Sequence, residues 1–190
     1  MKIIILVTFL TFSTSCSTID YEKNSKLIKY TKSSILSVHI GYEYYLNGKL
    51  MDHPLQFSDG VIDIEKDYKL IIQKIKDGNQ FSNVKIDFPA AEYELELNII
   101  FKNESNLALA FISGVTFTLF PSIIDSDLEI QGILYNRRLG IKSKKIIASG
   151  KMRTYFGILQ LIYMPFSNSS KNRELLISNL LNQIMNDTEL

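Results

Sequence analysis

The sequence predicts an α+β fold: one domain that forms a two-layer sandwich, with a mostly antiparallel or mixed sheet and two amphipathic helices on one face. Three observations lead to this prediction. Several segments alternate apolar and polar residues with the period of two that is typical of half-buried strands. Two segments, one after the first strand and one near the C-terminal end, repeat apolar residues at helical spacing. Most strands follow one another closely, which favours antiparallel or mixed pairing.

Composition places limits on the function. The 190 residues carry a formal net charge of +1 at pH 7, and lysines and acids are interspersed along the chain. The sequence shows neither the basic face of a nucleic-acid binder nor the polybasic block that binds anionic lipid. The hydrophobic content of 46% suffices for an apolar core, and the length is typical of one domain. We therefore expect a single globular domain that does not bind nucleic acid.

The N-terminal residues have the layout of a secretory signal peptide. Lys2 is followed by an apolar segment from Ile3 to Phe12, by three small residues and then by Cys16, the single cysteine of the chain. The sequence thus predicts a signal peptide over 1–15, a polar, lysine-rich tether over 16–32 and one domain over 33–190. An ordinary signal peptide with an incidental cysteine is the alternative. An uncleaved anchor is disfavoured, because about ten apolar residues are too short to span a bilayer.

A cysteine directly after small residues resembles the lipobox of bacterial lipoproteins, although Ser13 stands where an aliphatic residue is usual. This resemblance implies that the chain is cut before Cys16 and that Cys16 is then acylated. It implies in turn a membrane-anchored protein of the cell envelope. Ser17, in place of an Asp, favours the outer membrane. With its one cysteine acylated, the chain has no thiol for a disulfide, a zinc site or a nucleophile.

Alternation predicts the first part of the sheet. From Ser34 to Leu46, apolar side chains recur at every second position, which indicates a half-buried strand. Asn47-Gly48 ends this strand with a turn that readily takes positive φ. The run Leu50–Phe57 can return as a second strand, but Pro54 confines it to an edge or a loop.

A helix and two further strands follow. Glu65–Lys76 carries an apolar stripe at helical spacing, and Gly78 closes it. Asn83–Phe88 reads as a strand, and Glu92–Lys102 alternates most clearly of all. The carboxylates of this last segment share one face, which we expect to be the solvent side of the sheet; a calcium-binding or catalytic row is the alternative. These carboxylates belong to Glu92, Glu94 and Glu96.

Two long uncharged segments flank a predicted hairpin. Leu107–Ile124 is as long as a membrane span, but its Ser, Thr, Gly and Pro residues favour a buried strand or hairpin arm. The alternatives are a loop or short helix that dips into a membrane interface or a partner's groove, and a true span. Asp127–Asn136 and Ser143–Tyr155 form the hairpin, with a solvated turn between them. Tyr155–Phe166 is the second uncharged segment, and a helix with a core-facing stripe from Leu176 to Ile184 follows it.

The open ends of this hairpin lie side by side, so both uncharged segments should meet at one end of the domain. Adjacent apolar segments either extend the core or form an exposed patch, and large exposed apolar patches usually mark an interface. Extension of the core is the simpler interpretation. If the segments are exposed, they form the candidate contact region. Its residues are Phe111, Val115, Phe117, Leu119, Phe120, Phe156, Ile158 and Leu161.

A second resemblance covers residues 93–185. The strand Tyr93–Phe101, the run Ser113–Ser122, Tyr155-Phe156-Gly157 with Pro165, and the leucine-rich last helix resemble a group of small envelope lipoproteins of unknown function. This resemblance implies an envelope lipoprotein and carries over no catalytic residue. The order of elements also resembles, as a fold-level analogy, periplasmic accessory or assembly domains such as the amino-terminal domain of the Tol-system β-propeller protein.

The sequence contains no recognisable catalytic or cofactor motif. His39 and His53 are isolated, and the HExxH, GxSxG, GxxxxGK[ST] and GxGxxG patterns do not occur. We therefore expect a non-enzymatic protein without metal or cofactor, anchored to the membrane through its N-terminal lipid, whose domain binds another envelope protein or supports an assembly. The alternative is a module that binds lipid or another apolar small molecule in a pocket lined by the two uncharged segments.

Overall fold

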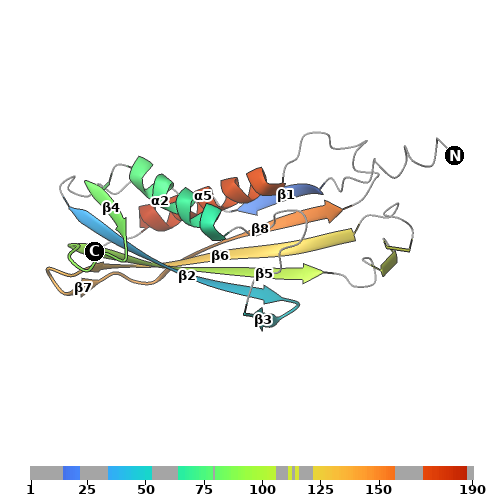
Figure 1. The fold of residues 1–190 in the computed structure, drawn as a ribbon, viewed down its shortest axis with the longest axis horizontal. Coiled ribbons are helices and arrows are strands. Elements are labelled where there is room, and N and C mark those ends of the chain that lie inside the picture. Colours follow the sequence, from blue (N-terminus) through green and yellow to red (C-terminus); the bar gives the residue numbers. More distant parts are fainter. Residues whose placement is uncertain are drawn as a thin grey trace.

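The computed structural model describes residues 15–21, 34–52, 64–78, 80–105, 111–112, 114–115, 122–156 and 169–187. These residues form an eight-stranded sheet and two long helices (Figure 1). The strands are β1 (Ser15–Tyr21), β2 (Ile35–Leu46), β3 (Lys49–Met51), β4 (Asn83–Ile86), β5 (Tyr93–Ser105), β6 (Ser122–Asn136), β7 (Ile141–Lys142) and β8 (Ile146–Phe156). The helices are α2 (Ile64–Asp77) and α5 (Ser169–Asp187).

The described strands make one open, mixed sheet. Their order is β1-β8-β6-β5-β2-β3, with β4 beside β2 and β7 beside β6. β1, β8, β6 and β5 pair antiparallel with one another in that order, whereas β2 runs parallel to both β5 and β4. The prediction of helices combined with a mixed sheet is confirmed, and β6 and β8 are the predicted hairpin.

The N-terminal segment differs from the tether expected over 16–32. Its first residues belong to β1, an edge strand that pairs with β8 over its whole length, from Ser15 opposite Phe156 to Tyr21 opposite Gly150. This short segment has no strict alternation, so its strand character comes from pairing with β8 rather than from its own pattern. Residues 22–33, the remainder of the expected tether, lie outside the described residues.

One face of the sheet carries the apolar core. The alternation predicted for β2, β5 and β6 places their apolar side chains on this face, as expected. Burying a side chain of this size contributes about 1.5–3 kcal/mol, so this face supplies much of the stability. Among its most deeply buried members are Leu36, Val38, Leu95, Leu97, Ile99, Phe101, Leu128 and Ile130.

Both helices lie over this core-bearing face (Figure 1). α5 packs on β8, β1 and β6, and α2 packs beside α5 and β4. Two glycines let α5 approach closely: a Cβ at Gly132 would stand 2.4 Å from Ile184 Cγ2, and one at Gly150 would stand 2.6 Å from Leu176 Cδ1. The helix therefore rests directly on the backbone of β6 and β8. The predicted apolar stripe of α5 is buried throughout, and that of α2 is buried at Ile71 and Ile75.

A buried polar cluster joins α2, α5 and β2. Arg173 on α5 forms an ion pair with Asp67 on α2, and their side chains are only 7% and 4% exposed. The Arg173 guanidinium also donates to the Tyr42 hydroxyl at 3.0 Å and lies 5.3 Å from the centroid of the Phe101 ring. Burial raises the pKa of Tyr42 to about 12, so its hydroxyl stays protonated at neutral pH. Because each charge offsets the desolvation of the other, removing either one strongly destabilises the fold.

The opposite face, which no described helix covers, is polar; we call it the open face. Tyr135 donates to the Glu96 carboxylate at 3.1 Å, and Arg137 pairs with Glu94 at 2.7 Å. The solvent-side prediction for the β5 carboxylates is therefore confirmed. Arg137, predicted to be solvated at the hairpin turn, also donates to the carbonyl oxygen of Pro89 and so ties the turn to the chain before β5.

The turn after β2 has the predicted conformation. Asn47 and Gly48 have φ angles of 49° and 77°, and the described return strand is β3. It is shorter than the expected Leu50–Phe57, of which His53 and the residues after it lie outside the described part. The turn is held to the end of β5, because the Asn47 backbone N–H donates to the Asn103 carbonyl at 2.9 Å.

Candidate functional site

The two uncharged segments are attached to the same end of the sheet. Ser105, where the first segment leaves β5, lies opposite Ile124; Ser122, where it rejoins the sheet, lies opposite Phe156. Phe156 is also where the second segment leaves, and Ser15 lies opposite it on the other side. The predicted convergence of the attachment points is confirmed, and Figure 1 shows the ends of β5 and β8 pointing the same way. We call this end of the sheet the apolar end.

Part of the first segment is described, and its backbone is helical at 111–112 and 114–115 (Figure 1). The expectation of a buried strand is wrong for this part. Phe111, Ile112 and Val115 are 74%, 44% and 63% exposed, and a Cβ at Gly114 would meet open space. The pattern of aromatic and β-branched residues suggested a strand, but β propensity depends on pairing with neighbouring strands, and these positions belong to no described strand.

The other predicted contact residues are not brought together by described structure. Phe117, Leu119, Phe120, Ile158 and Leu161 lie outside the described residues. Phe156 ends β8, where its backbone pairs with both Ser15 and Ser122. Among the described helices, none has the length and apolar character needed to cross a membrane.

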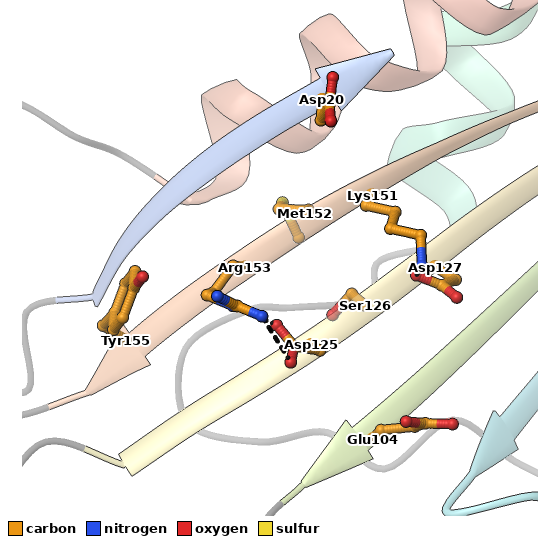
Figure 2. A pocket seen from close by; sticks show the side chains of 9 residues that line it. All are labelled: Asp20, Glu104, Asp125, Ser126, Asp127, Lys151, Met152, Arg153 and Tyr155. Carbon is orange, nitrogen blue, oxygen red and sulfur yellow. Dashed lines mark hydrogen bonds and ion pairs between the residues drawn. The ribbon is translucent and has the colours of Figure 1, made fainter.

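A charged cleft of about 480 Å³ crosses the open face (Figure 2). Arg153 reaches from β8 to Asp125 on β6 and donates twice, from Nε to Oδ1 at 2.5 Å and from Nη2 to Oδ2 at 3.1 Å. Lys151 points to Asp127 in the same way, at 3.7 Å. The hydrogen bonds with the Asp125 carboxylate raise the pKa of Arg153 above its usual value. The lining residues are Asp20, Glu104, Asp125, Ser126, Asp127, Lys151, Met152, Arg153 and Tyr155.

A second cleft of about 400 Å³ adjoins the first and shares Asp20, Asp127 and Lys151 with it. Both are lined by charged side chains, so they suit a polar contact rather than an apolar ligand. Sequence reasoning did not identify this surface. The available signal was the alternation of acids at Asp125, Asp127 and Glu129, matched by the bases of the returning strand.

Two features of the described residues bear on metal binding and catalysis. Among the described residues, no group of three or more His, Cys, Asp or Glu side chains is placed to hold a metal ion. His39 Nδ1 lies 2.8 Å from Asp87 Oδ1, and both side chains are more than half exposed. The hydrogen bond with Asp87 raises the pKa of His39. Neither of the two described clefts includes His39 or Asp87.

No protein-family model and no curated protein matches the sequence. Several solved structures align with most of the chain. The PelC dodecamer from Paraburkholderia phytofirmans aligns over 92% of this chain and 99% of its own, with 12% identity and a TM-score of 0.36. Protein XCC0632 from Xanthomonas campestris, described by DUF330, aligns over 85% and 91%, with 9% identity and a TM-score of 0.43. A homolog of a neuraminyllactose-binding hemagglutinin from Helicobacter pylori aligns over 88% and 84%, with 11% identity and a TM-score of 0.36. At such low identities and TM-scores, these similarities say nothing about the function of this chain.

Proposed function

We propose that this chain is a lipoprotein of the cell envelope, held at the outer membrane by acyl chains on Cys16. Its two-layer α+β domain acts without catalysis, as a protein-binding or assembly-accessory unit. The apolar end is the contact region of the anchored domain, and the open face is the second surface on which a partner can bind.

One observation carries the proposal: β1 begins at Ser15, and Cys16 is already paired with Tyr155 of β8. An acyl group on Cys16 would therefore attach to the sheet itself, without a flexible spacer. Two or three acyl chains hold a protein firmly, whereas one is marginal, because each buried methylene contributes about 0.8 kcal/mol. Such an anchor would keep the domain permanently at the membrane surface, where an accessory subunit is useful.

The chemistry of the described surface fits a binding role better than a catalytic one. Asp125 and Glu94 pair with arginines, and Glu96 accepts a hydrogen bond from the Tyr135 hydroxyl. The buried ion pair of Arg173 with Asp67 lines neither of the two described clefts. The alternative of a module for apolar ligands gains no support from the two described clefts, which are charged.

Metabolic labelling tests the anchor. Cells that express the full chain are fed a clickable fatty acid, and we expect label on the wild type and on the matched control Ser17→Ala, but none on Cys16→Ser. The Cys16→Ser protein should also leave the membrane fraction. Persistent labelling of Cys16→Ser would show that the acyl group is elsewhere and would refute the anchor.

Photocrosslinking in intact cells tests the binding role. A photoreactive amino acid replaces Ile147, an open-face residue of β8 that is 54% exposed. We expect one defined crosslinked protein from this position. The same replacement at Leu139, on the distant hairpin turn and 65% exposed, serves as a control. If both positions give the same diffuse set of products, the open face does not bind a specific partner.

A further inference from the structure

We propose that the helical positions Phe111, Ile112 and Val115 lie against the lipid bilayer, so that the domain stands on the membrane by its apolar end. The surface involved is part of the contact region, and its partner is a lipid surface rather than a protein groove. This inference rests on the proposed function, because it takes the anchored N-terminus as the point where the chain meets the bilayer.

The first observation is exposure. Phe111, Ile112 and Val115 are 74%, 44% and 63% exposed, although they are close together in the chain and all three have helical backbone. Single exposed apolar residues are ordinary, but neighbouring ones without a charge between them are typical of an interaction surface. The whole segment 107–124 is uncharged. A contact with an apolar medium requires this lack of charge, whereas a solvated loop does not.

The second observation is position. Ser105, Ile124, Thr154 and Ser17 form one row across β5, β6, β8 and β1. Adjacent strands lie roughly 4.8 Å apart, so this row places Ser105 about 14 Å from Ser17. Phe111 follows Ser105 by six residues, a chain length that reaches at most about 20 Å. The exposed residues are thus tied to the end of the sheet at which Cys16 enters it.

The third observation is a gradient of polarity along the strands. Tyr155 lies opposite both Cys16 and Ile123, at the level of the proposed anchor. The first charged pair, Asp125 with Arg153, comes two residues further in, which is about 7 Å along a strand. From the apolar end inward, exposed apolar side chains are followed by a tyrosine and then by charged residues. The same order is found across a membrane–water interface.

The bilayer is the expected partner because no linker separates Cys16, the proposed anchor, from β1. Cys16 already belongs to β1, where it pairs with Tyr155. If acyl groups on Cys16 hold the chain, as proposed above, the apolar end cannot move far from the membrane. A protein groove would have to displace lipid from the same place. We therefore assign this helical region to an interfacial contact, with its apolar side chains among the lipid headgroups and upper acyl chains.

Depth-dependent quenching tests this assignment. The full chain, isolated from membranes with its native N-terminus, is reconstituted into vesicles of phosphatidylethanolamine and phosphatidylglycerol. A genetically encoded, environment-sensitive fluorophore replaces Phe111 in one sample and Leu139 in the other. Leu139 is the matched control, because it is 65% exposed but lies on the hairpin turn at the opposite end of the sheet.

We expect the fluorophore at position 111 to be blue-shifted, quenched by nitroxides on lipid acyl chains and shielded from aqueous iodide. The fluorophore at position 139 should show the opposite behaviour. Equal access of iodide to both positions would overturn the proposal. Shielding at 111 without lipid quenching would also overturn it, since protein would then cover the site. Lipid quenching at both positions would refute the upright orientation.

The mass of the N-terminal peptide, measured on the same samples, separates this inference from the proposed function. If Cys16 is acylated and position 111 is aqueous, the inference fails and the anchor stands. If Cys16 is not acylated and position 111 is lipid-quenched, the anchor fails and the bilayer contact stands. As a further check, Val115→Asp should abolish the lipid quenching at position 111, whereas Asp introduced at Ile141, exposed near the far turn, should leave it intact.

Discussion

The two faces of the sheet use the same pair of residue types in opposite ways. On the helix-covered face, Arg173 and Asp67 are 7% and 4% exposed and join two helices to the sheet. On the open face, Arg153 and Asp125 are 52% and 47% exposed and link neighbouring strands that are already hydrogen-bonded. The contact chemistry is similar, but its surroundings differ. Burial therefore decides whether the loss of one partner of an arginine–aspartate pair strongly destabilises the fold or has little effect on its stability.

The largest effect should come from breaking the buried pair. Arg173→Ala leaves the Asp67 carboxylate buried without a countercharge, and we expect a loss of about 3–5 kcal/mol in the free energy of unfolding, measured by urea denaturation. The double variant Arg173→Met with Asp67→Leu is the control, because it removes both charges and should recover much of the loss. If Arg173→Ala were as stable as the wild type, the pair would not be needed to hold the two helices on the sheet.

The next largest difference between the two faces should appear when a methyl group is added to a glycine on each. In Gly132→Ala the new methyl would stand 2.4 Å from Ile184 Cγ2, beneath α5. We expect a loss of about 1–3 kcal/mol, typical of an overfilled core. Gly41→Ala on the open face is the matched control, since its methyl would meet the movable Asn98 amide at 3.1 Å. Adding Ile184→Ala to Gly132→Ala should cost less than the sum of the two changes.

Breaking the exposed pair should matter much less. Arg153→Ala leaves Asp125 in contact with water, so the urea midpoint should shift by a small fraction of the shift for Arg173→Ala. That shift should vanish in 1 M NaCl, where the Debye length is only about 3 Å. A shift as large as that of the buried pair would mean that the open face contributes to the fold in a way that its exposure does not suggest.

The smallest effect is a pH dependence at His39. The hydrogen bond with Asp87 raises the pKa of His39 in the folded state. The stabilisation is therefore fully present below the unfolded pKa of about 6.5, and it is lost as the pH rises through the higher folded value. His39→Gln should be slightly less stable than the wild type at pH 5.5 and equal to it at pH 8.5, by urea denaturation. A difference that persists at pH 8.5 would rule out protonation as its cause.

Local patterning predicted the elements that alternate. The strict period of two in β2, β5 and β6, and the helical stripes of α2 and α5, identified five elements and the face that each buries. The Asn47-Gly48 turn was also predictable, because few residue pairs accept two successive positive φ angles.

Long-range pairing was not predictable from the same signals. β1 lacks strict alternation and is defined by β8, which lies at the far end of the sequence. The parallel pairing of β2 with β5 depends on which strands become neighbours, and no local pattern encodes this. The composition around Phe111 predicted a strand, but its backbone is helical, for a related reason. β propensity reflects contact with neighbouring strands, and no strand beside Phe111 is described.

The pairing of β1 with β8 also determines when, during synthesis and folding, the edge of the sheet can form. β1 is synthesised first, but its partner is the last strand to be made, so the edge of the sheet closes only after nearly the whole domain has emerged. Closing so long a loop is slow in comparison with local hairpins. During that interval Cys16 is not yet part of a sheet, so the modification proposed above has time to occur before the residue is fixed. Pairing with β8 then holds residue 16 at the edge of the sheet.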